Sequence, residues 1–302
     1  MTGPQGTGSD ASIERLCRLA EVSRASYYRH WQASAPRVEE MGLKDAIQRL
    51  ALPQRRYGYR QIAAHLRRQG WQANHKRVLR LMREDNLLCL RTKTFVPATT
   101  DSRHGWRVVP NLARGMELTG IDQLWVADIT YVHLAEEFAY LAIILDAFSR
   151  KVIGWALDGH LRAELAIKAL EMAITARRPA PASLIHHSDR GVQYACGDYV
   201  ALLAKHDIQP SMSRVGNPYD NAKAERFMRT LKEEEADGSD YRDVTDARRK
   251  IGLFIETVYN RARLHSALDY LTPEEYEATL PQQRQGRVPA AAASINQTCP
   301  CF

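Results

Sequence analysis

The spacing of apolar residues changes partway along the chain. Near the start, the apolar residues from Ile13 to Leu19 recur at the period of a helix that buries one face. Further along, the apolar residues form short runs rich in β-branched side chains. These runs predict three strands joined as a meander, at 124–132, 138–145 and 152–157. The chain therefore divides into a helical front part and a part that mixes strands and helices.

The helical front part contains two predicted units. A helix from Ile13 is followed by a second short helix that opens at Val22 and Ser23 and runs through Tyr28, and the pair resembles a small helix-turn-helix. In the second unit, which is strongly basic, a helix over 61–69 precedes a turn at a glycine. Both units have the size of a small DNA-binding module.

The last helix of the front part has a distinct division of side chains. Asn74 can cap a helix that runs to about Asp85, and Val78, Leu79 and Met82 mark its inner face. Its remaining surface carries four basic residues, Lys76, Arg77, Arg80 and Arg83. Such a helix can lie in a DNA major groove with these side chains on phosphates and base edges. It can equally be an amphipathic helix that packs on its neighbours and exposes a solvated basic face.

The charge of the chain supports the same division. The net charge is +7, and residues 1–120 hold 21 Lys and Arg against 10 Asp and Glu, a net of +11. The remainder is mildly acidic. A basic front half next to an acidic remainder indicates a DNA-binding region joined to a region that carries catalytic carboxylates, although a solvated basic surface gives the same count.

The order of elements beyond the front part indicates a fold. After the meander, the pattern predicts a helix over 163–176, a strand over 183–187, a helix over 199–205, a strand over 208–212 and a final helix that carries Glu225. This is the order of a ribonuclease-H-like α/β fold, a mixed five-stranded sheet with flanking helices. The fold places the ends of its first and fourth strands side by side.

Three acidic residues lie on three different elements of this predicted fold. Asp128 lies in a buried first strand, Asp189 follows the fourth strand, and Glu225 lies on the final helix, with 35 residues between the last two. A buried carboxylate is costly unless it is paired or binds a metal. Three converging carboxylates form a hard oxygen site suited to Mg²⁺ or Mn²⁺. A pair of such ions can activate an attacking oxygen and stabilise the leaving oxygen of a phosphodiester.

Several motifs in order carry a resemblance to a known family. The chain resembles the OrfB-type DDE transposases of bacterial insertion sequences, the IS-three family, which are relatives of retroviral integrases. The likeness covers roughly residues 10 to 280. The matching stretches are Trp125-Val-Ala-Asp128-Ile-Thr, His187-Ser-Asp189-Arg-Gly191-Val-Gln193-Tyr, Ser213-Arg-Val-Gly216-Asn217-Pro-Tyr-Asp220-Asn221-Ala, Glu225-Arg-Phe, Tyr259-Asn260-Arg261, Arg263-Leu-His265-Ser266-Ala-Leu and Leu271-Thr-Pro273-Glu274. The family's site thus falls on Asp128, Asp189 and Glu225 here. The His/Cys zinc module of retroviral integrases has no counterpart in this sequence.

The resemblance implies a DNA transposase that cleaves the ends of its element and joins them to target DNA, with two Mg²⁺ or Mn²⁺ ions and no covalent protein–DNA intermediate. It also implies a companion OrfA-type subunit and a homo-oligomer assembled on DNA. On the final helix, Arg229 and Lys232 share a face with Glu225, and the resemblance favours DNA contact for Lys232. Ordinary charge pairing on an exposed helix is the alternative there.

Two other functions fit parts of the pattern. A DNA-binding regulator with a catalytically silent core would keep the front part, and a ribonuclease acting on RNA–DNA hybrids would share the fold. The intact acidic set argues against the first, and the two basic helical units argue against the second. His187, next to Asp189, is interpreted as structural, because a metal-bound water needs no protein base. Asp146 is expected to pair with Arg150, outside the metal site.

Composition bounds the location and the domains. Five scattered cysteines without a C-x-x-C pair predict reduced cytosolic thiols, and the lack of a long apolar run predicts no membrane span. The resemblance implies a cytoplasmic bacterial protein that associates with the nucleoid when active. The expected division starts with a flexible leader (1–10), a small helix-turn-helix (11–35), a second helix-turn-helix-like unit (36–90) and a basic linker (91–120). An integrase catalytic core (121–235), a helical extension of that core (236–280) and a disordered tail (281–302) follow.

Overall fold

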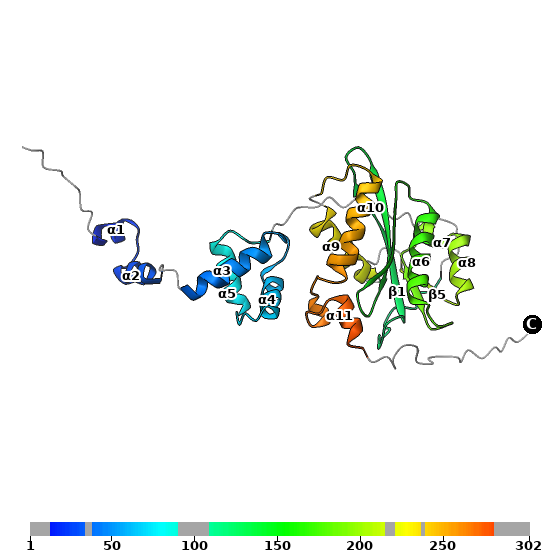
Figure 1. Ribbon diagram of the computed structural model, residues 1–302, viewed down its shortest axis with the longest axis horizontal. Coiled ribbons are helices and arrows are strands. Elements are labelled where there is room, and N and C mark those ends of the chain that lie inside the picture. The colour runs from blue at the N-terminus through cyan, green and yellow to red at the C-terminus, as the bar shows by residue number, and fades with distance from the viewer. Residues whose placement is uncertain (1–12, 34–37, 90–108, 215–220, 237–238, 281–302) are drawn as a thin grey trace, which may run out of the picture.

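The computed structural model describes residues 13–33, 38–89, 109–214, 221–236 and 239–280 (Figure 1). The expected leader, the expected tail, most of the basic linker and most of the loop before Glu225 lie outside these described residues. Within the described residues, no helix is long and apolar enough to cross a membrane.

Five helices form the front part, and they follow the predicted pattern with two differences. Their bounds are α1 Ile13–Leu19, α2 Arg24–Ala33, α3 Val38–Ala51, α4 Tyr59–Arg68 and α5 His75–Glu84. The second helix runs past Tyr28, and α3 was not foreseen as a separate helix. Gly70 makes the turn between α4 and α5 with a φ of +87°, a backbone conformation that glycine adopts without strain.

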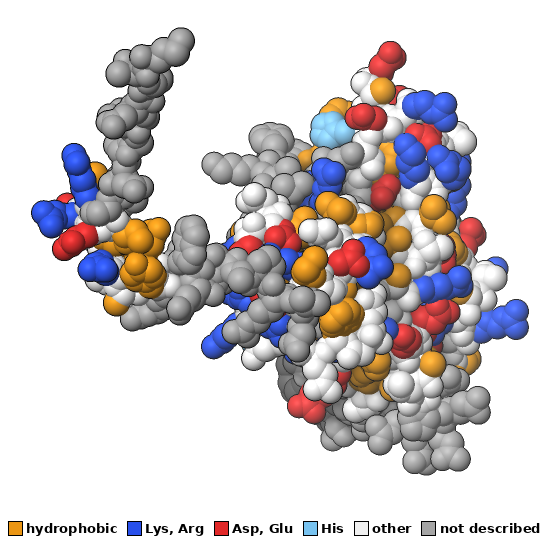
Figure 2. All heavy atoms as spheres, turned by 60° about the vertical axis from the view of Figure 1, so that its left-hand side comes forward, with side chains coloured by type: hydrophobic (Ala, Val, Ile, Leu, Met, Phe, Trp, Pro, Cys, Tyr) orange, Lys and Arg blue, Asp and Glu red, His pale blue; other side chains and the backbone are white. Residues whose placement is uncertain are grey.

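Helices α3, α4 and α5 share one small core. Ile47, Ile62, Leu66, Val78 and Leu81 are buried together in it. By contrast, α1 and α2 leave Leu19, Val22 and Tyr28 exposed, and apolar side chains of this part are visible at the surface in Figure 2. The three-helix unit therefore has its own hydrophobic core, and α1 with α2 adds little to it.

The second part is built on a five-stranded sheet of order β3-β2-β1-β4-β5. The first three strands pair antiparallel, and β4 and β5 are added parallel to β1. The strand bounds are β1 Leu124–His133, β2 Phe138–Asp146, β3 Val152–Asp158, β4 Ile185–Ser188 and β5 Gln209–Met212. This is the ribonuclease-H-like mixed sheet that the order of elements predicted.

Helices cover both faces of the sheet (Figure 1). On one face, Trp125 and Ala127 pack against α6 and its neighbours; on the other, Val126 packs with Phe227 and Ile251 of the later helices. The helix bounds are α6 Ala163–Arg177, α7 Val192–Ala195, α8 Gly197–Lys205, α9 Ala222–Glu234, α10 Val244–Leu253, η3 Phe254–Tyr259, η4 Ser266–Leu268 and α11 Pro273–Ala278. Alternate residues of β1 thus point into two separate cores.

One helix lies unusually close to the sheet. A Cβ added at Gly154 of β3 would lie 2.2 Å from the backbone oxygen of Ala169 and 2.8 Å from the backbone nitrogen of Ala173. Glycine at this position therefore lets α6 pack directly on the strand, without the space that a side chain would need.

Asp146 does not pair with Arg150 as expected. Its buried carboxylate instead accepts hydrogen bonds from the backbone N–H groups of Asp122, Phe148 and Ser149, at 2.7, 3.0 and 2.8 Å. Burial raises the pKa of Asp146 to about 6, and these hydrogen bonds oppose the increase. The prediction failed because a carboxylate at a strand end can hold a tight turn by accepting backbone hydrogen bonds, and local sequence does not distinguish the two roles.

Candidate active site

The register of the sheet brings the first two acidic residues together. Strand β4 runs parallel to β1, with Val126 opposite His187. Asp189 follows the end of β4 directly, and its charge adds to the raised pKa of Asp128, so the two carboxylates lie near each other.

The third acidic residue is positioned by a hydrogen bond to the same strand. The Asn221 Nδ2 donates to the backbone oxygen of Ala127 at 2.9 Å, and Asn221 is buried. This bond holds the start of α9 against β1, one residue before Asp128. Glu225 lies in the first turn of α9. The sequence allowed for Asn221 either a turn or cap role or a part in a loop over the active site, and it did not indicate this contact with β1.

The three carboxylates affect one another electrostatically. Burial raises the pKa of Asp128 to about 8, and the negative charges of Asp189 and Glu225 add to the increase, while Lys232 opposes it. Burial likewise raises the pKa of Glu225, and Arg229 opposes that shift. Both carboxyl groups are thus harder to ionise than in water, and a nearby cation would favour their charged forms.

The donor chemistry of this cluster fits a hard divalent cation, because all three side chains offer carboxylate oxygens. Among the residues that the structure describes, however, no three His, Cys, Asp or Glu side chains lie close enough together to hold a metal ion as they stand. The carboxylates are therefore electrostatic neighbours whose oxygens do not yet converge. That they share metal ions remains a prediction.

The surroundings of Asp189 are tightly built. Its Oδ1 accepts a hydrogen bond of 2.9 Å from the Gly191 backbone N–H, and a Cβ at Gly191 would lie only 3.0 Å from that oxygen. The hydroxyl of Tyr194 is buried and has no hydrogen-bond partner within the described ranges. Burial raises the pKa of Tyr194 well above its usual value, and the charges of Asp189 and Asp128 add to this shift. The sequence interpretation did not single out Tyr194.

His187, for which the sequence allowed a structural role or support of a metal ligand, is held by two hydrogen bonds. Its ring is buried, with Nδ1 at 2.9 Å from the Ser211 hydroxyl and Nε2 at 3.0 Å from the Ser213 hydroxyl. These two hydrogen bonds join β4 to β5 and to Ser213, the residue that follows β5. With both nitrogens engaged in this way, the imidazole supports the strand end that carries Asp189.

The basic residues of α9 extend along the helix from Glu225. Lys232 places its Nζ 4.1 Å from the ring centre of Tyr131, so a cation–π contact holds the ammonium over β1. Arg229 is exposed, and Lys232 is partly buried. This ridge of positive charge beside the carboxylates has the arrangement that a bound phosphate requires, and DNA contact by either residue remains a prediction.

Helix α5 is capped as predicted, and two of its basic side chains form ion pairs with an acid of α3. The Asn74 Oδ1 accepts a hydrogen bond of 2.9 Å from the Lys76 backbone N–H. The Glu40 carboxylate pairs with Arg80 at 2.7 Å and with Arg77 at 3.4 Å. Lys76 and Arg83 are exposed. The buried residues of α5 are Val78, Leu81 and Met82. Leu81 therefore belongs to the inner face, whereas Leu79, which was predicted to lie there, is half-buried.

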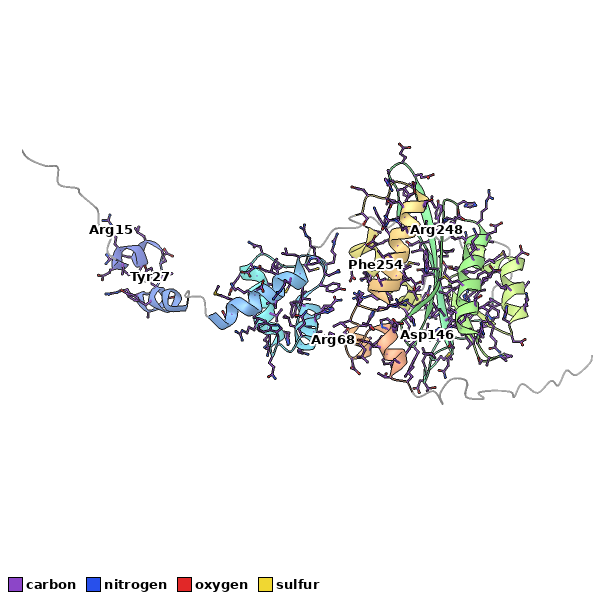
Figure 3. The ribbon with its side chains drawn as sticks, in the orientation of Figure 1. Arg15, Tyr27, Arg68, Asp146, Arg248 and Phe254 are labelled. Atoms are coloured by element: carbon purple, nitrogen blue, oxygen red, sulfur yellow. The ribbon has the colours of Figure 1, made fainter. Side chains whose placement is uncertain are left out.

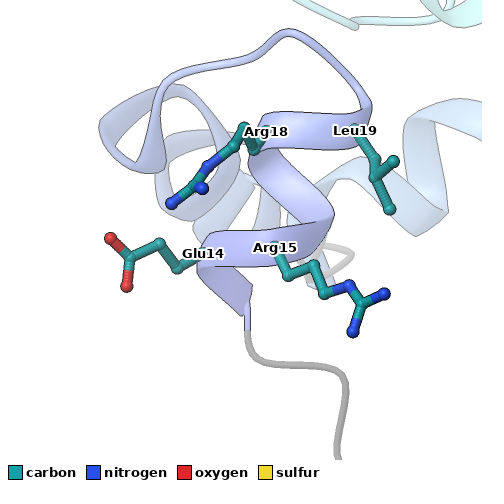
Figure 4. Close-up of a pocket in the computed structure, with 4 residues that line it drawn as sticks. All are labelled: Glu14, Arg15, Arg18 and Leu19. Carbon is teal, nitrogen blue, oxygen red and sulfur yellow. The ribbon is translucent and has the colours of Figure 1, made fainter.

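A hollow of about 390 Å³ on α1 has no connection with this chemistry (Figure 4). The described residues that line it, Glu14, Arg15, Arg18 and Leu19, come from one short helix.

Comparison with protein families defines the class. Residues 38–95 match the HTH-like domain family, and residues 119–218 and 206–273 match two models of the integrase core domain. The chain thus joins a helix-turn-helix-like domain to an integrase core, a combination found in proteins that act on DNA. The two matched regions correspond to the two separately packed parts of the fold.

Individual relatives narrow the class to a family. The chain is 38% identical over 266 residues to an uncharacterised 31 kDa protein of insertion element IS600 from Shigella sonnei, covering 86% of this chain and 97% of that protein. It is 34% identical over 275 residues to transposase InsF of insertion sequence IS3A from Escherichia coli, covering 89% and 95%. The chain belongs to the IS3 family of insertion-sequence transposases, which are enzymes of the DDE transposase and integrase class.

Solved structures of viral integrases are also similar. A chain of the simian T-cell lymphotropic virus intasome, solved in complex with PP2A regulatory subunit B56 gamma, aligns with a TM-score of 0.46 at 16% identity, covering 80% of this chain and 77% of that chain. The catalytic core of HTLV-2 integrase, solved in complex with magnesium, aligns with a TM-score of 0.40 at 16% identity, covering 53% and 98%.

Proposed function

We propose that Asp128, Asp189 and Glu225 are the catalytic carboxylates of this transposase and that they bind a pair of divalent cations, Mg²⁺ or Mn²⁺. The chain would cleave the phosphodiester at each end of its insertion sequence and transfer the exposed 3′-hydroxyl to target DNA. When bound, the ions supply activation of the attacking oxygen and stabilisation of the leaving oxygen. The residues of the chain hold the site and position the DNA phosphate.

The observation that supports this proposal is the set of contacts around the three acidic residues. Strand β4, which Asp189 follows, pairs with β1, and the Asn221 amide bonds the start of α9, which carries Glu225, to the same strand. Burial, together with the charges of Asp189 and Glu225, raises the pKa of Asp128, and a bound cation would favour its charged form.

Lys232 and Arg229 would hold the scissile phosphate next to the carboxylates. Lys232 is directed over Tyr131 toward the site and lowers the pKa of Asp128. The carboxylate-rich site would repel DNA without these positive charges. We propose that their main part is to bind and orient phosphate, since neither side chain is suited to remove a proton at neutral pH.

The expected partners follow from the family and the domains. We propose that the chain binds the terminal repeats of its element and target DNA, works with a companion OrfA-type subunit, and assembles as a homo-oligomer on DNA. A regulator with a catalytically silent core remains the alternative function. The two functions differ in one measurable property, which is cleavage.

The decisive experiment is cleavage of labelled element ends in Mg²⁺ by Asp128→Asn, Asp189→Asn and Glu225→Gln variants. Each change keeps the shape of the side chain and removes its charge, so we expect loss of nicking and joining with DNA binding retained. Binding depends mainly on basic contacts to phosphate. Asp198→Asn, a change to an exposed acid on α8, serves as the matched control and should keep activity. Full joining by the Asp189 variant would refute the assignment.

We also propose that α5 contributes to recognition of the element ends through Lys76, Arg77, Arg80 and Arg83. The ion pairs to Glu40 allow the four residues to be tested as two pairs. Lys76→Gln with Arg83→Gln should weaken end binding and reduce the dependence of log affinity on log salt by roughly 0.9 for each phosphate that is no longer neutralised. Arg77→Gln with Arg80→Gln should have the same effect on DNA and should also lower stability, because the two ion pairs with Glu40 are lost. Unchanged affinity and salt slope in both folded variants would make α5 a scaffold helix.

A further inference from the structure

A second pocket lies where the helix-turn-helix-like unit meets the core. Its volume is about 300 Å³, and its walls come from α4, the turn after β2, α9 and the segment that follows η3. The lining residues are Gly58, Arg60, Gln61, Arg150, Lys223, Arg226, Thr230, Tyr259, Arg263, Leu264, His265, Ser266, Ala267 and Tyr270. Five of them are Lys or Arg and none is acidic, so the pocket has a strongly positive wall.

Most of this positive charge is uncompensated. Arg263 is paired with Glu234, but Arg60, Arg150, Lys223 and Arg226 form no ion pair with any described residue. Burial lowers the pKa of His265 to about 3, and Arg263, Arg150 and Arg226 add to the decrease, so these three cations lie near the His265 ring.

Several cations elsewhere in the described part of the chain are paired with acids. On the face shown in Figure 2, basic and acidic side chains are interspersed. Arg49 pairs with Asp45, Lys168 with Asp158 and Arg261 with Glu274. At the pocket wall, the amide nitrogen of Gln61 is buried and donates to no described residue. A donor and several cations therefore line a pocket whose described lining residues include no acid.

A direct contact ties the two walls of the pocket together. Arg68 of α4 binds the Glu275 carboxylate through two hydrogen bonds of 2.9 and 2.7 Å and donates to the Tyr270 backbone oxygen at 3.0 Å. Figure 3 shows Arg68 at this junction between the front unit and the core. A bidentate Arg–carboxylate pair fixes orientation as well as distance. The junction thus holds Arg60 and Gln61 opposite the cations of the core.

We propose that this pocket binds a phosphate of the DNA backbone and that it guides DNA from the helix-turn-helix-like unit to the active site. The inference rests on the proposed function and adds a contact surface to it. Clustered guanidinium groups match phosphate oxygens through planar forks of N–H donors. A metal ion is repelled by the same charges, and an apolar ligand would leave them unpaired.

The position of the pocket on α9 suits this role. Residues 223, 226 and 230 recur three and four positions apart, so Lys223, Arg226 and Thr230 line the pocket from one face of the helix. Glu225 occupies the adjacent face with the carboxylate site. One rigid helix therefore presents a phosphate-binding face and a catalytic face to DNA that passes around it.

The test is equilibrium binding of the full chain to a labelled duplex that carries an element end, in EDTA and over a range of salt concentrations. The pocket variant is Arg150→Gln with Arg226→Gln. The matched control is Arg178→Gln with Lys205→Gln, which removes two exposed charges after α6 and at the end of α8. We expect the pocket variant to bind about tenfold more weakly, the effect of removing one charge-assisted hydrogen bond. Its salt slope should fall by roughly 0.9 for each phosphate that the variant no longer neutralises.

A charge-retaining variant separates charge from folding. Arg150→Lys with Arg226→Lys should keep most of the affinity, and thermal unfolding checks that all variants fold. Arg60→Gln tests the wall from the front unit alone and should weaken binding in the same direction. Equal affinity of the pocket and control variants for the duplex would refute the proposal. So would binding of free phosphate alone in the pocket, without any effect of the pocket variant on DNA. Because EDTA removes any contribution of metal-dependent catalysis, failure here is distinguishable from failure of the carboxylate assignment, which is read by cleavage.

Discussion

The end of α9 is held by a buried ion pair whose removal should destabilise the core. Arg263 lies in the segment after η3, and Glu234 is the last residue of α9. The Arg263 Nε lies 2.9 Å from the Glu234 Oε2, and Nη2 lies 2.8 Å from Oε1, a bidentate geometry. The side chains are only 13% and 7% exposed. The pair therefore connects the extension of the core to the helix that carries Glu225.

The expected magnitude follows from the burial of both charges. Removing one partner leaves the other charge desolvated without compensation, which costs about 3–5 kcal/mol in buried pairs. For a folded unit of 150–250 residues this corresponds to a decrease in Tm of about 6–20 °C. Replacing both residues by Met removes both charges and should cost much less than the sum of the single changes, because no uncompensated charge remains.

The assay is urea unfolding of four proteins, namely the natural chain, Arg263→Met, Glu234→Met and the double variant. Their free energies of unfolding form a double-mutant cycle, which isolates the pairwise energy. We expect the Glu234 change to be the more damaging, since Arg150 and Arg226 lie near Arg263 and would repel it further. Single changes that each cost under about 1 kcal/mol and that add in the double variant would show the pair to be worth no more than a surface salt bridge.

Two further outcomes are expected. Gly154→Ala should destabilise the core by about 1–3 kcal/mol or more, because its Cβ would overlap the Ala169 backbone. Gly197→Ala is the control in the same unfolding assay. It should be close to neutral, because no atom lies within 4 Å of the added Cβ. Hydrogen bonding to Lys250 lowers the pKa of Asp246 to about 2, below its unfolded value, so its stabilisation is present above pH 3.8 and is lost as the pH falls through 2. The Tm advantage of the natural chain over Asp246→Asn should shrink across that range, and a constant difference would contradict the linkage.

Local sequence patterns predicted the sheet and its order well, and the reason is physical. A buried strand needs continuous apolar and β-branched residues, so the runs at 124–132 and 138–145 differ little from the observed β1 and β2. The motif resemblance and the strand order together also foresaw that Asp128 and Asp189 would be neighbours. These features depend on residues close in sequence or on one well-defined topology.

Contacts between distant residues escaped prediction. The Asn221 bond to Ala127 joins positions 94 residues apart, and Arg77 and Arg80 reach Glu40 from another helix. Nothing in the spacing of a helix reports which acid of another helix will pair with it. The short helix α7 was missed for a related reason, since four residues are too few to show a helical period.

The anchoring of α9 at both ends explains how one helix can serve two sites. At its start Asn221 is bonded to β1, and at its end Glu234 is paired with Arg263. A helix fixed at two points on the core cannot rotate about its axis without breaking one of these contacts. The two contacts therefore fix the direction of Glu225 and of Arg226 together. If the two proposals hold, a phosphate in the pocket would be placed at a fixed distance from the proposed catalytic carboxylates, which is the positioning that phosphoryl transfer depends on.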